Sequence, residues 1–398
     1  MLSLAREDTL PEGPATSVDP EQKANIMPKV RLSGTITGTN DPGRAVRARL
    51  LSLLFAGGWD IYNSNGDQHI SLANIERKII ESDAFVFTPG ATLEDMFKAV
   101  SIFVGYQTLD RHLAGKPTVL LNGDGSWNPL FAVLRHLRER GTIRQDYRDY
   151  LLTADAPEEV PALLDSVRSA GLPDPGRHRM EHGGASQATD SFETTVPVDY
   201  LGNACVFCSA TLENPSYLAD GEELGRQLAQ SRIGCVSGAG RSGIMGAVVK
   251  GAVDAGGWTG GSNVPHIIEL EGLPEGLSSF WLRPDIYTRM EVMIRHSDAF
   301  VIFPGGAGTV QELLALMIFQ AQENPLMQGK PVVIFNRADG SGHGFWDPMI
   351  ELLDSLTQPG SFQVAGSFDE LLPMVKSGLV RKDLHLVEKT ASSLAEAV

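Results

Sequence analysis

The feature that most constrains the fold is a long internal repeat. Residues 82–90, SDAFVFTPG, return as SDAFVIFPG at 297–305, with seven of nine positions identical. Further along, GKPTVLLN at 115–122 is similar to GKPVVIFN at 329–336. The two pairs of segments thus keep the same order and the same offset of about 215 residues. This period is far longer than the roughly 20–50 residues of solenoid repeats. We therefore expect a duplicated domain.

The domain boundaries follow from the repeat and from a change in composition between the copies. Residues 173–197 are rich in Pro, Gly, His, Ser and Thr with little apolar periodicity, which is typical of a linker. The polar first residues lack the apolar core of a secretory signal. The expected organisation is a loose leader at 1–27, a first domain at 28–172, the linker, a second domain at 198–385 and a tail at 386–398.

The pattern of the second copy predicts an α/β fold. Short apolar, β-rich runs are expected to be strands at 204–209, 234–237, 258–264, 299–303 and 332–336. Helical patterns alternate with them at 218–230, 243–255, 286–296 and from 309. Apolar strands separated by helices indicate parallel sheets covered on both faces. We expect two tandem Rossmann-like, doubly wound domains whose ligands bind at the carboxyl ends of the strands.

Composition excludes several classes of partner. A formal net charge of −16 and a pI near 5.0 argue against binding a nucleic-acid polymer. No apolar run approaches the roughly 18 residues of a membrane span, so no membrane partner is expected. The three cysteines favour a reducing cytoplasm. Cys205 and Cys208 have zinc spacing, but no second pair lies nearby, so we expect core packing and no metal.

A first glycine loop, Ser237-Gly-Ala-Gly-Arg-Ser-Gly-Ile-Met-Gly246, follows an apolar strand and opens a helix. Its glycines allow backbone N–H groups to approach an anion at a helix N-terminus, which suits a phosphate. Gly238, Gly240 and Gly243 also fit the dinucleotide pattern. That alternative requires an acid about 20 residues later. The next strand, 258–264, contains none, so dinucleotide binding is the weaker interpretation.

A second glycine loop, Pro304-Gly-Gly-Ala-Gly-Thr-Val-Gln-Glu312, again lies between a strand and a helix. Its three glycines expose N–H groups, and Thr309 adds a hydroxyl at the expected helix N-cap. The purely structural alternative is a capping box between Thr309 and Glu312. A capping box alone would not require Gly305, Gly306 and Gly308, so an anion-binding loop is favoured.

These residues resemble a known family. The pattern PGGxGTxxE at 304–312 resembles the signature of the LOG (Lonely Guy) family, often labelled lysine decarboxylases, whose characterised members are nucleoside monophosphate phosphoribohydrolases. CVFCS at 205–209 resembles the first strand of the family, 238–246 its glycine loop and DIYTRM at 285–290 its arginine-containing helix. The resemblance covers essentially the whole second half.

The resemblance implies the residues of the site. Arg289 and Glu312 take the positions of the essential arginine and glutamate. Phosphate and ribose binding would fall to Gly238, Gly240, Gly243, Met245, Gly246, Asp285, Gly305, Gly306, Gly308 and Thr309. Two residues depart from the family pattern: Met290 replaces a lysine and Ala239 replaces a glycine.

The residue types also suit the reaction. Breaking a ribosyl N–C bond creates an oxocarbenium-like sugar, which needs a nearby anion and a positioned water. The Glu312 carboxylate would supply the anion and would position the attacking water by accepting its proton. The guanidinium of Arg289 suits phosphate or ribose oxygens. We therefore expect hydrolysis of a nucleoside 5′-monophosphate to free base and ribose 5-phosphate, without a cofactor.

The first copy retains the fold segments but not the site residues. PGATLEDMF at 89–97 has lost two glycines, and without a gap Phe97 stands at the position of Glu312. Asn74 stands where Arg289 does. Because family members usually act as homodimers, a fused inactive copy is expected to replace the partner as an intramolecular pseudo-dimer; a further homodimer is left open.

Two alternatives come from other functional classes. A nucleotide sensor of the same fold would bind without turnover, although a pure binder has no need of Glu312. Amino-acid decarboxylation is disfavoured, since no lysine Schiff-base or pyridoxal context is recognisable.

Overall fold

A computed structural model describes residues 27–33, 42–63, 77–110, 112–113, 115–174 and 190–379. Apart from Met27, the expected leader lies outside these residues, as do most of the linker and the tail after residue 385. Within the described residues, no helix is both long and apolar enough to cross a membrane.

The first half is a five-stranded sheet in which all neighbouring strands are parallel, in the order β2-β1-β3-β4-β5. Helices α2 and α6 pack on one face around Leu50 and Leu164, whereas α4 and α5 cover the other face. The elements are β1 (Lys29–Ser33), α2 (Pro42–Ala56), β2 (Asp60–Asn63), β3 (Ala84–Phe87), α4 (Leu93–Gln107), β4 (Thr118–Leu121), α5 (Asn128–Glu139), η1 (Tyr147–Asp149), β5 (Leu151–Ala154), η2 (Pro157–Glu159) and α6 (Val160–Ala170).

The second half is a seven-stranded parallel sheet in the order β12-β11-β10-β6-β7-β8-β9. Helices α7 and α8 pack on its outer face, and α10, α11 and α12 cover the inner face. The elements are β6 (Gly202–Phe207), α7 (Pro215–Gln230), β7 (Ile233–Ser237), α8 (Gly243–Asp254), β8 (Thr259–Asn263), α9 (Pro265–Glu271), β9 (Ser279–Leu282), α10 (Ile286–Arg295), β10 (Ala299–Ile302), α11 (Ala307–Ala321), η3 (Pro325–Met327), β11 (Val332–Phe335), α12 (Asp347–Leu356) and β12 (Gln363–Ala365).

The two sheets repeat one order of strands. Read across the sheets, β7-β6-β10-β11-β12 of the second half matches β2-β1-β3-β4-β5 of the first, and β8 and β9 extend the second sheet beyond β7. The central strands are buried along their length, which explains why their sequences are continuous apolar runs. The predicted α/β class, with two doubly wound parallel sheets, is confirmed.

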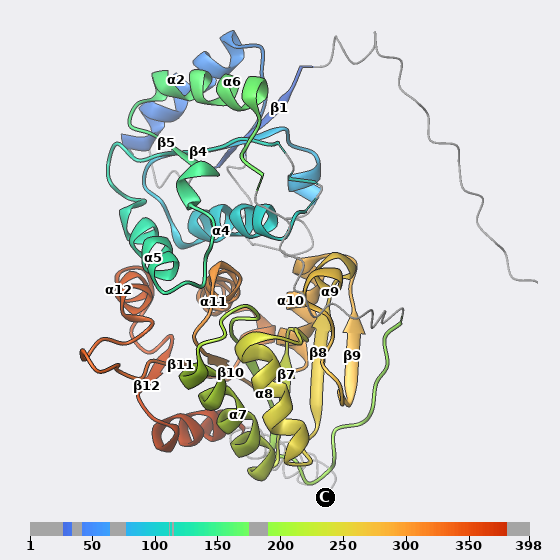
Figure 1. Ribbon diagram of the computed structural model, residues 1–398. Coiled ribbons are helices and arrows are strands. Elements are labelled where there is room, and N and C mark those ends of the chain that lie inside the picture. Colours follow the sequence, from blue (N-terminus) through green and yellow to red (C-terminus); the bar gives the residue numbers. More distant parts are fainter. Residues whose placement is uncertain are drawn as a thin grey trace, which may run out of the picture.

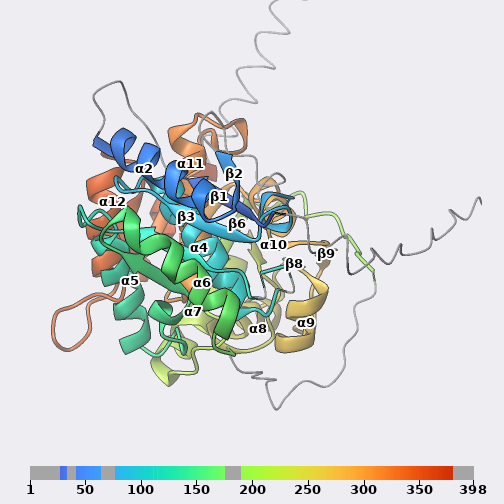
Figure 2. The same ribbon diagram turned by 90° about the horizontal axis from the view of Figure 1, so that it is seen from above.

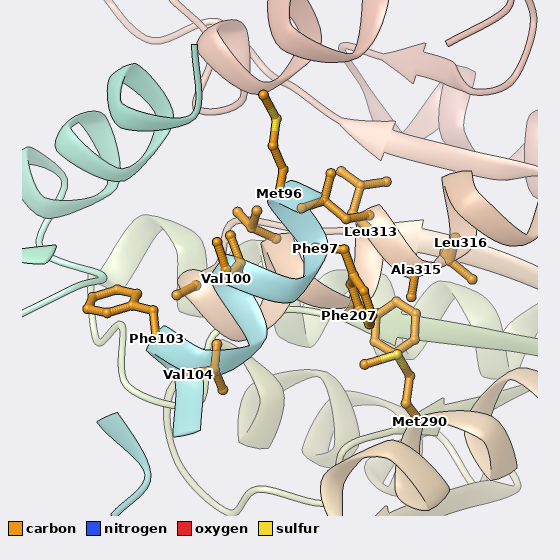
Figure 3. Packing of buried hydrophobic residues seen from close by; sticks show 14 of the residues in the cluster. Met96, Phe97, Val100, Phe103, Val104, Phe207, Met290, Leu313, Ala315 and Leu316 are labelled. Carbon is orange, nitrogen blue, oxygen red and sulfur yellow. The ribbon is translucent and has the colours of Figure 1, made fainter. Parts of the chain in front are cut away.

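The halves are stacked, with their inner helices in the middle (Figure 1). Viewed from above, the first half lies over the second (Figure 2). Helix α4 packs on α11 and α5 packs on α12, so helices at matching places in the two halves meet as in a pseudo-dimer. Met96 and Phe97 of α4 lie near Leu313 of α11 in this shared core, which also holds Val100 and Leu316 (Figure 3).

Polar contacts reinforce the shared core. The Gln311 side-chain amide donates to the Ser101 hydroxyl at 3.0 Å, and both groups are buried. A ring nitrogen of His136 lies 2.9 Å from the carbonyl oxygen of Phe345. The two halves thus share one continuous hydrophobic core, and these two polar contacts join them across it.

The end of the expected linker is attached to the second sheet. Phe192 forms an antiparallel bridge with Phe280 of β9, and the Thr194 backbone N–H donates to the Ser279 hydroxyl at 2.8 Å. Residues 190–197 therefore run along the edge strand, where they satisfy backbone groups that an edge would otherwise expose.

Candidate active site

A cavity of about 230 Å³ lies between the two halves, at the carboxyl ends of β6 and β10. From the second half it is lined by the residues after these strands, by α9 and α10 and by the start of α11. From the first half it is lined by the end of α4 and by segment 142–145. Both the strand ends and the meeting of two units are usual places for ligand pockets.

Arg289 lies on α10 and is fixed by backbone carbonyl groups. Its Nε donates to the Ser262 oxygen at 2.9 Å and one terminal nitrogen donates to the Gly238 oxygen at 3.0 Å. Asp285 caps this helix by accepting from the backbone N–H groups of Tyr287 and Thr288, each at 2.8 Å. A rigidly held guanidinium on the cavity wall can present its remaining N–H groups to a ligand.

The first glycine loop is shaped by the side chains that lie over it. A β-carbon on Gly238 would collide with the Arg289 guanidinium, and one on Gly240 would lie 2.8 Å from a carboxylate oxygen of Glu271. Gly243 has a φ of +59° and lies against the backbone of Ala210. These glycines make room for close neighbours, and they do not line the cavity.

The second glycine loop leads into α11, and no side chain caps the start of this helix. Gly306 is the N-cap residue, whereas Thr309 and Glu312 already lie inside the helix. The capping-box interpretation is therefore wrong, because the helix begins at Ala307, before Thr309. A helix N-terminus without a side-chain cap is a ready site for an anion.

Glu312 is the buried acid of this cavity. Burial raises the pKa of its carboxyl to about 8, the positive charge of Arg289 opposes that shift, and the negative charge of Glu271 adds to it. No hydrogen bond or ion pair to the Glu312 carboxylate occurs among the described residues. Its carboxyl group is thus left for a ligand or a water.

Glu271, at the end of α9, is a second acid in the cavity that the sequence did not reveal. Burial raises the pKa of its carboxyl, and the nearby Arg289 opposes the shift. It forms no ion pair with any described residue. No motif in the sequence marks it, because it enters the cavity from a short helix after β8.

The structure divides the expected site residues into three groups. Those that line the cavity are Met245, Arg289, Gly306, Gly308, Thr309 and Glu312. Those that support lining residues are Gly238, Gly240, Asp285 and Gly305. Gly243 and Gly246 border a different surface pocket beside α8. Further lining residues that the sequence did not single out include Ser209, Thr211, Glu271 and Arg144.

The corresponding loop of the first half is filled by its own side chains. The Gly90 backbone N–H donates to the Asp124 carboxylate at 2.7 Å, and the Ala91 N–H donates to the Ser126 hydroxyl at 3.1 Å. Thr92 and Asp95 form a capping box at the start of α4. Internal acceptors thus occupy the N–H groups that an anion would need there.

The three cysteines lie in the core as free thiols, as expected, and burial raises their pKa values. Cys208 also reaches the cavity wall. Within the described part of the chain, no cluster of three His, Cys, Asp or Glu residues is arranged to hold a metal ion.

A family model described as "possible lysine decarboxylase" matches residues 52–164 and 245–365, which together exceed half of the chain. The chain belongs to this family. The match includes parts of both halves, and it includes Arg289 and Glu312 in the second.

Curated relatives of this LOG family chain are phosphoribohydrolases by name. The probable cytokinin riboside 5′-monophosphate phosphoribohydrolase LOG4 of Oryza sativa subsp. japonica is 34% identical over 40% of this chain and 67% of its own length. The cytokinin riboside 5′-monophosphate phosphoribohydrolase LOG4 of Arabidopsis thaliana is 30% identical over 42% of this chain and 74% of its own length.

Solved structures give weaker likenesses. A molybdenum cofactor binding protein from Rippkaea orientalis is 19% identical, with a TM-score of 0.35, and covers 46% of this chain and 98% of its own. The molybdenum cofactor carrier protein of Chlamydomonas reinhardtii is 22% identical, with a TM-score of 0.35, over 45% of this chain and 98% of its own.

Proposed function

We propose that this chain hydrolyses the N-glycosidic bond of a nucleoside 5′-monophosphate and releases a free base and ribose 5-phosphate. The observation that carries the proposal is one cavity in which Arg289, Glu312 and the uncapped start of α11 meet. Kinship with named phosphoribohydrolases supports the same reaction.

In the proposed mechanism, ionised Glu312 lies near C1′ of the ribose. As the C1′–N bond breaks, its negative charge stabilises the oxocarbenium-like sugar. A water attacks C1′ and gives a proton to the carboxylate, while the base leaves with the bonding electron pair and takes a proton from solvent. Glu312 then returns its proton to solvent, so the sum of the step is the addition of one water. One bond to nitrogen is thus replaced by one to water oxygen, with no oxidant or reductant.

Arg289 and the start of α11 would hold the substrate. The guanidinium is always charged and can bind ribose or phosphate oxygens in a fixed direction. Gly306, Gly308 and Thr309 line the cavity at the positive end of the α11 dipole, which favours the dianionic phosphate. Phosphate binding distant from the reacting bond would position C1′, so a nucleoside without phosphate should react poorly.

We also infer that the first half is a second, degenerate copy of the catalytic domain. The repeated strand order and the repeated sequence segments support a duplication. Counted from the first residue of each helix, Glu312 in α11 corresponds to Lys98 in α4, where the ungapped repeat places Phe97. Neither residue can replace a carboxylate, so one working site per chain is proposed.

The test is base release from a panel of nucleoside 5′-monophosphates and the matching nucleosides. We expect selective cleavage of a monophosphate, loss of activity in Glu312→Gln, and full activity in Glu351→Gln, an exposed acid on α12. Tight nucleotide binding with no base release by the unaltered protein would contradict hydrolysis and favour the nucleotide sensor.

A further inference from the structure

The wall that the first half contributes to the cavity carries one charged side chain, Arg144. It follows α5 in the segment Thr-Ile-Arg-Gln at 142–145. Its side chain is exposed, and within the part of the chain that the structure describes it makes no hydrogen bond or ion pair. A cationic side chain that lines a cavity and has no partner within the described residues is available to a ligand.

The segment that carries Arg144 is held in place. Thr142 is buried and donates through its hydroxyl to the Leu137 oxygen at 3.0 Å, and Ile143 is also buried. The Gln145 side-chain oxygen accepts from the Gln107 amide of α4 at 3.0 Å. Arg144 therefore projects from an ordered backbone, which reduces the entropy lost when it binds a ligand.

This segment touches the anion-binding end of α11. The carbonyl oxygen of Thr142 lies 2.9 Å from the point where a β-carbon on Gly306 would stand, and Gly306 is the N-cap of α11. Only one residue, Ile143, separates Thr142 from Arg144. The backbone that carries Arg144 thus lies beside the N-terminus of α11, and Arg144 and Gly306 line the same cavity.

The other charges of the cavity leave Arg144 as the cation best placed for a phosphate. Arg289 is bound to two backbone carbonyls and interacts with Glu271 and Glu312. The C-terminal end of α4, the remaining part of this wall, carries the negative end of a helix dipole. In a chain of net charge −16, an anion needs local positive groups of this kind.

We propose that Arg144 binds the 5′-phosphate of the substrate together with the start of α11, so that the half without catalytic residues supplies part of the binding site. This inference rests on the proposed function. It assigns the inactive half a direct contact with the substrate in addition to its packing role.

The test measures ribose 5-phosphate binding by calorimetry, and kcat and KM for the preferred monophosphate, in full-length Arg144→Ala and Arg144→Lys. Arg135→Ala is the matched control, because Arg135 is an exposed arginine of α5 that does not line the cavity. We expect Arg144→Ala to weaken ribose 5-phosphate binding and raise KM by about 10- to 100-fold, with kcat little changed. Arg144→Lys should recover part of the affinity, and Arg135→Ala should have none of these effects.

Two outcomes would overturn the role of Arg144. One is unchanged ribose 5-phosphate affinity in Arg144→Ala, and the other is an equal loss in Arg135→Ala, which would indicate a general charge effect. The binding measurement does not depend on turnover. An unaltered protein that binds ribose 5-phosphate through Arg144 but releases no base would contradict the proposed hydrolysis and leave the phosphate contact standing.

Discussion

At the scale of single residues, the protonation of Glu312 decides what the cavity can do. A carboxyl with a pKa of about 8 is mostly protonated at neutral pH, when it carries no negative charge to offer a developing cation. Enzymes commonly use such shifts to keep a catalytic group near its working pH. The proposed mechanism requires the ionised form.

The first prediction concerns pH. Because the pKa is raised and the ionised form is the active one, kcat/KM should rise with pH and level off above about 8. A pH profile of base release measures this, with Glu351→Gln as a control that should keep the same profile. A rate that falls as the pH rises through the same range would instead identify Glu312 as a proton donor.

The second prediction concerns Glu271. Its negative charge raises the pKa of Glu312, so Glu271→Gln should move the rising limb of the pH profile toward lower pH. Glu269→Gln is the matched control, since Glu269 is an exposed acid on the same helix α9. If both variants keep the unaltered profile, the two acids of the cavity are not coupled.

At the scale of elements, the start of α11 combines helix formation with an open surface. A β-carbon on Gly308 would meet no atom within 4 Å, yet Gly308 lines the cavity. Its lack of a side chain is therefore not required by packing. It leaves space that a ligand can occupy.

The third prediction follows from that space. Gly308→Ala should keep or raise the melting temperature, because alanine is favoured over glycine in a helix by about 1 kcal/mol. It should nevertheless weaken ribose 5-phosphate binding, since the added methyl group enters the cavity. Gly340→Ala, also unobstructed but away from the cavity, should leave binding unchanged. Full binding by Gly308→Ala would place the anion elsewhere.

At the scale of the whole molecule, one hydrophobic core joins the halves through α4 and α11. The helix that stabilises the joint also lines the cavity at its end. Stability and activity should therefore depend on the same interface, although the two functions belong to different parts of α4.

The fourth prediction tests this interface. Phe97 is fully buried in the shared core, and Phe97→Ala should cost about 3–5 kcal/mol of unfolding free energy. Base release should fall as well, because the end of α4 would shift. Phe55→Ala on α2 removes a phenylalanine that is 73% exposed, and we expect little change in either quantity. Thermal melting and base-release rates of the two variants provide the comparison.

The sequence located the parts of the fold that depend on local pattern. Every strand expected in the second half is present within two residues, because most of these strands are short apolar runs, as strands buried on both faces of a parallel sheet are. Arg289 and Glu312 were expected from the family resemblance, and both line one cavity. The expected N-cap at Thr309, and with it the alternative of a capping box, was wrong because one residue type near a helix start does not fix where the helix begins.

What the sequence alone determined is thus the α/β class, the two parallel sheets and the segments that carry the predicted catalytic pair, since each depends on neighbours along the chain. Only the tertiary structure brought Glu271 and Arg144 to the same cavity, because one enters from a short helix without a motif and the other from the opposite half. It also decided that Gly238 and Gly240 make room for Arg289 and Glu271. Contacts between residues far apart in sequence depend on how the sheets stack, and no local pattern records that geometry.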